Sequence, residues 1–225
     1  RGGGVKKEWK SWEDQVALLK GRHLALDEGE ALGLLRTASY YRLSGYARYF
    51  QQGAELGGND FVAGSTLADI KMIHELDGRL RTMLASRLGR VEVMLRSQYA
   101  YAVGATMSDG DMPVWAAAEV LSFAYLRNRC AHHARLWNHS VIDAGATPNN
   151  VRKKTKRRFG NVDGRSVMDV LASLADVLER CGLEDDFLGT VSREFKDHPL
   201  FWDGLLWPCA VEDRSKKGHP FHESS

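Results

Sequence analysis

Cysteine is scarce in this chain, since only three of its 225 residues are cysteines: Cys130, Cys181 and Cys209. The three lie far apart and form no Cys-x-x-Cys pair, so the pattern supports neither a disulfide framework nor a thiolate zinc site. Such sparing use of cysteine favours a reducing compartment, and we expect a cytoplasmic protein.

Long hydrophobic runs are missing as well. A membrane-spanning helix needs about 18 consecutive apolar residues, and no stretch of the chain approaches that length. We therefore expect no membrane partner. The N-terminal residues Arg1 to Lys7 lack the apolar core of a secretory signal. Strand-like alternation and internal repeats are also absent. The net charge is only +2, so the overall charge does not by itself indicate a nucleic-acid partner.

Helical periodicity, by contrast, extends along most of the chain. Residues suited to cap a helix N-terminus predict helices that begin after Ser11, Asp27, Thr66 and Ser166. The helix after Thr66 is the longest and runs to about Val103, because apolar residues recur there at spacings of three and four: Ile73, Leu76, Leu80, Leu84, Leu88, Val91 and Leu95. A further helix is predicted from Phe123 to about Trp137. These patterns predict an all-α fold.

In the polar segment Asn149 to Gly160, six of seven consecutive residues are cationic: Arg152, Lys153, Lys154, Lys156, Arg157 and Arg158. Two interpretations apply. Such a run is most often a solvated loop, but it can also contact the phosphates of a nucleic acid. We predict a single domain over residues 8–212, followed by a flexible tail over residues 213–225.

When the segment from Leu126 to Asn138 is drawn as a helix, its polar and apolar residues fall on different faces. With Arg127 at zero, Ala131, Arg135, Asn128 and His132 fall at about 40°, 80°, 100° and 140°. The opposite arc holds apolar residues: Leu126, Trp137, Cys130, Phe123 and Ala134. One face is therefore expected to be buried. The other presents polar side chains around a small alanine, which leaves room for a substrate or a partner helix.

These side chains are the types needed to cleave RNA without a metal. A base must take the proton of the ribose 2′-hydroxyl, and an acid must protonate the departing 5′-oxygen. A histidine, whose ordinary pKa is about 6.5, can do either. Arginine binds phosphate oxygens with a permanent charge, and asparagine can orient the histidine or the phosphate. We therefore select Arg127, Asn128 and His132 as candidate catalytic residues, with His133 and Arg135 as accessory ones.

Each of these features also has a structural interpretation. Arginine and histidine on one helix face are commonly just solvated, and His133, at about 240° on the wheel, is better suited to a structural role. The aromatic stretch Tyr40 to Phe50 could stack on bases, but its helical spacing favours a packed core. Glu92 and Arg96 lie four residues apart, as in an intrahelical ion pair, although Glu92 could also assist the Arg127 segment.

Several motifs resemble known families. Arg127-Asn128-Arg129-Cys130-Ala131-His132 is similar to the RNxxxH form of the motif of HEPN ribonucleases. The longer segment 126–138 and the segments Tyr40 to Tyr46 and Leu88 to Arg96 resemble the Abi-like family of bacterial abortive-infection proteins. The three segments together span most of residues 10–140, and they are far more specific than the short motif alone.

The resemblance implies a HEPN-like helical bundle with additional N- and C-terminal helices. It also implies a homodimer whose two motif helices meet, and metal-independent RNA cleavage, without a cofactor, that arrests growth on phage infection. One departure stands out. Family members usually carry several tens of residues between the Leu-Ser-Phe that ends at Phe123 and the motif helix, and here Ala124 follows directly. We expect that a segment is omitted from the sequence at this point; the alternative is a genuine deletion, after which the helices would pack differently there.

The sequence thus predicts an endoribonuclease toxin of anti-phage defence. The alternative is a regulatory RNA-binding protein that holds a structured non-coding RNA without cutting it. Both could hold if that RNA restrains the nuclease as an antitoxin would.

Overall fold

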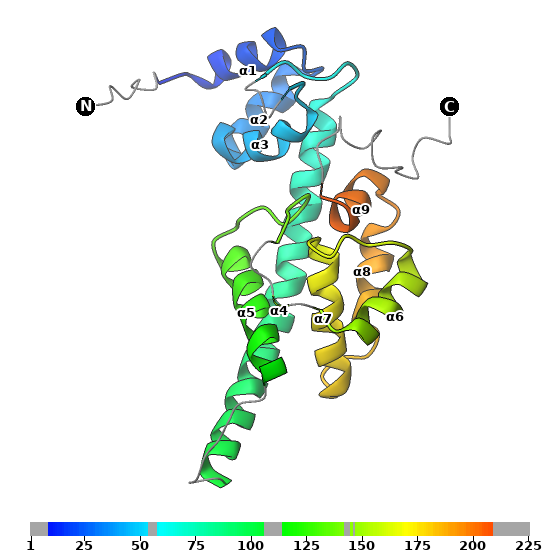
Figure 1. Ribbon diagram of the computed structural model, residues 1–225. Coiled ribbons are helices and arrows are strands. Elements are labelled where there is room, and N and C mark those ends of the chain that lie inside the picture. The colour runs from blue at the N-terminus through cyan, green and yellow to red at the C-terminus, as the bar shows by residue number, and fades with distance from the viewer. Residues whose placement is uncertain (1–8, 54–57, 106–113, 142–144, 146, 209–225) are drawn as a thin grey trace, which may run out of the picture. The chain divides into compact units, whose positions relative to one another are not determined.

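The computed structural model describes residues 9–53, 58–105, 114–141, 145 and 147–208. These residues form nine α-helices and only isolated β-bridges, which confirms the predicted all-α fold (Figure 1). The chain divides into two compact units, one ending at Glu75 and the other beginning at Leu76. The single domain over residues 8–212 stays a prediction, and the predicted tail over residues 213–225 lies outside the described residues.

The first unit contains α1 (Trp12–Gly21), α2 (Glu28–Ala38), α3 (Tyr40–Ala47), the 3-10 helix η1 (Arg48–Phe50) and the first turns of α4 (Leu67–Ala105). Its helices begin as predicted, because Ser11 forms a capping box with Asp14 and the Asp27 side chain accepts from the Glu30 N–H. Within the aromatic stretch five side chains are buried: Leu43, Tyr46, Ala47, Tyr49 and Phe50. They form part of the core of this unit, which confirms the packed-core interpretation.

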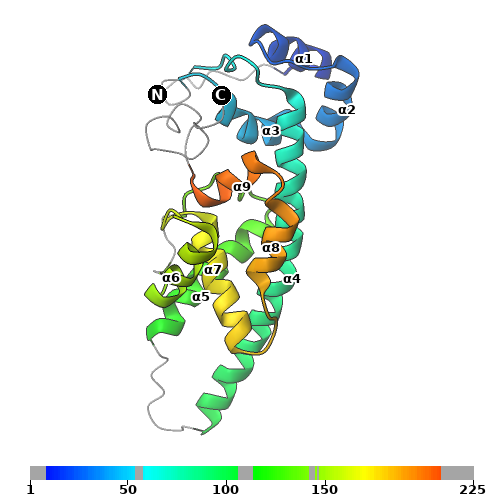
Figure 2. The same cartoon turned by 90° about the vertical axis from the view of Figure 1, so that its right-hand side faces the viewer.

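Helix α4 is the longest in the described part of the chain, as predicted. Its N-terminus is fixed by Thr66, whose hydroxyl oxygen accepts a hydrogen bond from the Asp69 N–H at 3.1 Å. In the second unit its buried ridge consists of Leu76, Leu80, Leu84, Leu88 and Val91. Among the described side chains of α4 beyond Val91, none is buried. That end of the helix extends past α7 and α8 (Figure 2).

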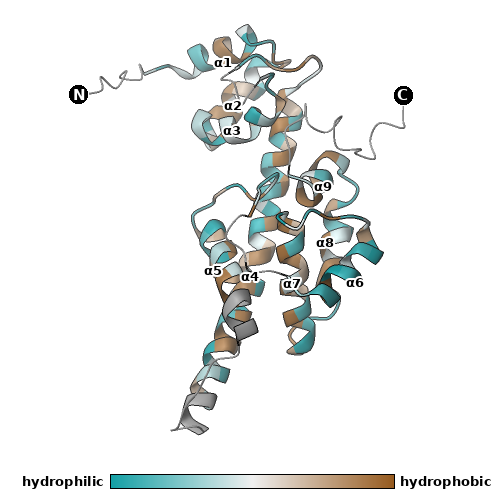
Figure 3. Cartoon of the chain, in the orientation of Figure 1, coloured by the Kyte–Doolittle hydropathy of each residue, from teal (hydrophilic) through white to brown (hydrophobic). Residues whose placement is uncertain are grey.

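The second unit adds α5 (Val114–Ala131), α6 (Asn149–Phe159), α7 (Val167–Arg180), α8 (Phe187–Phe195) and α9 (Pro199–Leu206). Helix α7 is its centre and packs against α5, α6, α8 and α9. It begins at the predicted cap, since Ser166 accepts from the Asp169 N–H. Its C-cap is Cys181, which is followed by Gly182 with a φ of 62°. Helix α7 carries many apolar residues along its length, whereas α6 is mostly hydrophilic (Figure 3).

Two expectations about helix limits were wrong. The basic segment is a helix, α6, and not a loop, because Val151 and Thr155 lie four residues apart and bury one face against the unit. Helix α5 ends at Ala131, six residues before the predicted end at Trp137. It also begins earlier than expected, and in this sequence it passes through Phe123 and Ala124 without a break. The omitted segment expected at this point stays a prediction.

Candidate functional site

The polar end of α5 is closed by a specific hydrogen-bond pattern. The Ala134 N–H donates to the Arg129 carbonyl at 2.8 Å, and the His133 N–H donates to the Cys130 carbonyl at 3.1 Å. This pair of bonds is a Schellman motif, in which the residue after the C-cap takes the left-handed conformation. His133 occupies that position with a φ of 53°. His133 therefore ends the helix, in agreement with the structural role that its place on the wheel favoured.

The predicted exposure of the polar sector is confirmed as far as His132. Arg127, Asn128, Ala131 and His132 are all exposed, while three residues of the opposite arc are buried: Phe123, Leu126 and Cys130. The prediction was wrong for Arg135, which was placed on the same helix face. Arg135 lies beyond the helix end and is half-buried.

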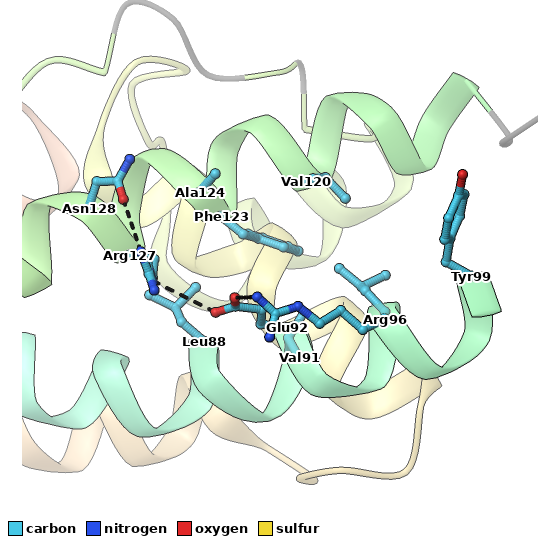
Figure 4. Close-up of a pocket in the computed structure, with 11 residues that line it drawn as sticks. Leu88, Val91, Glu92, Arg96, Tyr99, Val120, Phe123, Ala124, Arg127 and Asn128 are labelled. Atoms are coloured by element: carbon cyan, nitrogen blue, oxygen red, sulfur yellow. Dashed lines mark hydrogen bonds and ion pairs between the residues drawn. The ribbon is translucent and has the colours of Figure 1, made fainter.

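Arg127 contacts residues from both α4 and α5 (Figure 4). Its Nη1 donates to Asn128 Oδ1 at 3.4 Å, and its Nε lies 3.7 Å from Glu92 Oε2. Glu92 in turn accepts from Arg96 Nη2 at 2.6 Å, which confirms the expected intrahelical pair. Glu92 thus joins the two guanidinium groups and holds Arg127 beside α4.

The chain after His132 is held by a buried carboxylate that sequence reasoning did not single out. Asp77 on α4 is fully buried and accepts from the Trp137 N–H at 2.8 Å and from the Leu136 N–H at 3.2 Å. It also forms an ion pair with the buried Arg81, one turn further along α4. The i, i+4 spacing of Asp77 and Arg81 was visible in the sequence, but nothing there indicated that the pair is buried.

Helix α9 fixes the same loop from another direction. Trp137 Nε1 donates to the carbonyls of Leu200 and Phe201 at 3.3 and 3.1 Å, and the Asn138 N–H donates to the Gly204 carbonyl at 3.1 Å. A Cβ atom on Gly204 would lie 2.2 Å from Trp137 Nε1, so only glycine allows this close approach. The loop that follows His132 is therefore anchored both through its backbone and through the indole ring of Trp137.

A second polar cluster lies on the flank of α5. Tyr125 Oη and His139 Nε2 share a hydrogen bond of 2.5 Å, and Arg129 Nη1 donates to Tyr125 Oη at 3.2 Å. Burial, helped by the charges of Arg129 and Arg135, lowers the pKa of His139 to about 4, so this imidazole is neutral near pH 7. The cluster fixes the Tyr125 ring, which stacks on His139.

Cys130 is not a candidate nucleophile. Burial raises the pKa of its thiol to about 11, so the thiolate is scarce at neutral pH. Its side chain faces the core, together with Leu126 and Phe123. The chemistry of the segment therefore depends on the exposed sector.

The six cations of α6 fall into two groups. Three of them bind carboxylates: Arg152 with Asp169 at 3.2 Å, Lys154 with Glu179 at 3.4 Å, and Arg158 with Asp186 at 2.5 Å. The other three, Lys153, Lys156 and Arg157, are exposed and form no ion pair with a described residue. These three lie within about 100° on the helix, opposite the buried face. We call Lys153, Lys156 and Arg157 the outer cations.

Neither a metal-binding group nor a membrane span was found in the described part of the chain. No group of three or more His, Cys, Asp or Glu side chains there could hold a metal ion. None of the described helices combines the length and the hydropathy required to cross a bilayer.

Comparison with known protein families places a match on the first half of the chain. Residues 33–112 match the family model described as Abi-like protein. The matched range includes Tyr40 to Tyr46 and Leu88 to Arg96, two of the three segments that suggested this family, and it ends before Arg127. No curated protein and no solved structure matches the chain. The resemblance to the Abi-like family is thus confirmed over residues 33–112.

Proposed function

We propose that the protein is a HEPN-type endoribonuclease that acts in anti-phage abortive infection. The observation that carries this proposal is the exposed sector of Arg127, Asn128 and His132 at the C-terminal end of α5. The family match supports the defence role. The loop contacts of Asp77 and Trp137 support the site, because they hold the chain immediately after His132 in one conformation.

Cleavage would proceed by attack of a ribose 2′-hydroxyl on the adjacent phosphorus. The P–O5′ bond breaks as the new P–O2′ bond forms, which leaves a 2′,3′-cyclic phosphate and a 5′-hydroxyl. The His132 imidazole transfers one of the two protons, and Arg127 stabilises the charge on the phosphorane. Asn128, within hydrogen-bond reach of Arg127, orients the phosphate or the histidine.

The direct test is to incubate the purified protein with total RNA in the presence of EDTA and to map the product ends. We expect cleavage to continue, because the proposed mechanism uses side chains for proton transfer and for phosphate binding and requires no metal ion. The products should carry cyclic phosphate and 5′-hydroxyl ends. A strict requirement for magnesium would contradict the mechanism.

We further propose that α6 binds RNA and that the outer cations make the principal phosphate contacts. The variant Lys153→Gln/Lys156→Gln/Arg157→Gln should weaken RNA binding and reduce the slope of log K against log salt by about 2, since each lost contact removes about 0.7–0.9. The matched control, Arg152→Gln/Lys154→Gln/Arg158→Gln, also removes three charges but from residues engaged in ion pairs. Equal slopes for the two variants would contradict a special role of the outer cations.

The family resemblance leads us to propose a homodimer in which the two motif helices meet. A second Arg-Asn-His set would supply the second proton-transfer group that one imidazole cannot provide. Exposed Ala131 is small enough to let two helices approach. Ala131→Trp should therefore shift the protein from dimer to monomer in sedimentation and lower its cleavage rate. A wild-type monomer that is fully active at assay concentration would rule out a shared site.

The alternative function is a protein that holds a structured non-coding RNA without cutting it. The outer cations favour it, because they form a cationic face outside the Arg127 segment. Intact RNA that co-purifies with the wild-type protein and survives incubation would support this alternative over cleavage.

A further inference from the structure

A groove between α4 and α5 leads away from Arg127 (Figure 4). Its volume is about 390 Å³, within the range of about 300–1,000 Å³ that is usual for small-ligand sites. Six apolar residues line it: Leu88, Val91, Leu95, Val120, Phe123 and Ala124. The groove is therefore an apolar slot that opens beside a candidate phosphate-binding side chain.

The polar groups of the groove are not spread evenly. Arg127 and Asn128 lie at one end, and Glu92 and Arg96 follow along α4. Tyr99 lies at the far end. Two guanidinium groups face one carboxylate, so this edge carries a net positive charge and favours an anionic ligand.

We infer that the groove binds the nucleoside attached to the phosphate that Arg127 holds, with its base unstacked from single-stranded RNA. This inference rests on the proposed function and adds a substrate subsite to it. A nucleotide combines a charged phosphate with a flat apolar base, and the groove offers a cationic end that continues into an apolar slot. Proteins that bind single-stranded RNA commonly take splayed bases onto aromatic rings and guanidinium planes. Tyr99 and Arg96 provide both at this site.

Tyr99 offers a clean test because its side chain is 59% exposed and contributes little to the core. Binding would be measured in the His132→Ala background, by fluorescence anisotropy, with a short single-stranded RNA and with the same backbone lacking bases. Tyr99→Ala should weaken binding of the base-containing RNA by about 5- to 150-fold, as expected for the loss of one stacked base. Binding of the abasic strand should stay unchanged. The matched control is Tyr101→Ala, since Tyr101 is on the same helix, is 80% exposed and does not line the groove.

A second variant, Ala124→Trp, fills the groove from α5, and its thermal unfolding would be compared with that of wild type. It should reproduce the loss of base-dependent binding. Unchanged affinity in both variants would overturn the inference. So would a change from dimer to monomer in Tyr99→Ala, because the groove would then be an interface between copies of the chain. Base-dependent binding by a wild-type protein that cuts no RNA would support the groove while the cleavage proposal fails.

Discussion

His132→Ala should lower the rate of RNA cleavage by about 10²- to 10⁴-fold, the usual cost of losing a general acid or base. The side chain is exposed at the end of α5, and no buried contact depends on it. The free energy of unfolding should therefore stay within about 0.5 kcal/mol of the wild-type value. The measurements are single-turnover cleavage of an end-labelled RNA and thermal unfolding of the same preparation.

The neighbouring histidine provides the matched control. His133 has a positive φ and ends the helix in a Schellman motif, a position in which glycine is strongly preferred. His133→Gly should therefore keep the cap and retain most of the cleavage activity. If His132→Ala cleaved RNA as fast as wild type, or if His133→Gly alone abolished cleavage, the assignment of the reaction to His132 would fail.

The contrast between these two histidines shows how far the sequence alone could lead. Periodicity placed His132 on the polar sector and Cys130 on the buried one, because the helical repeat holds through Ala131. It misplaced Arg135, because a helix can end at a histidine when tertiary contacts hold the following loop. The usual stop signal, glycine or asparagine after the C-cap, is absent here. The N-terminal ends of helices were more predictable, since Ser11 and Ser166 satisfy backbone N–H groups locally.

Long-range partners were beyond sequence reasoning. Glu92 and Arg127 are 35 positions apart, and Asp77 and Trp137 are 60 apart, so no spacing rule connects them. The composition of α6 likewise could not show which of its cations are neutralised. That division depends on carboxylates that other elements bring to the helix, such as Asp169 and Asp186.

Asp77→Ala should destabilise the protein by about 3–5 kcal/mol, the range found when one partner of a buried ion pair is removed. The substitution leaves the Arg81 guanidinium buried without this carboxylate. It also takes the acceptor from the N–H groups of Leu136 and Trp137, and an unsatisfied buried donor costs about 1–3 kcal/mol. The loop after His132 should loosen as well, so cleavage should fall in the fraction that remains folded.

Asp176 and Arg180 on α7 supply a control with the same i, i+4 spacing. Their ion pair of 2.7 Å is only partly buried, with Arg180 47% exposed, so Asp176→Ala should cost no more than about 1 kcal/mol.

A rescue experiment separates charge from hydrogen bonding at Asp77. Asp77→Asn/Arg81→Met removes the buried charges but keeps an oxygen that can accept from the Trp137 N–H, so it should recover much of the lost stability. Denaturant unfolding of the three variants and of the wild type provides the measurement: equal losses for Asp77→Ala and Asp176→Ala would contradict the larger cost that burial assigns to the Asp77–Arg81 pair.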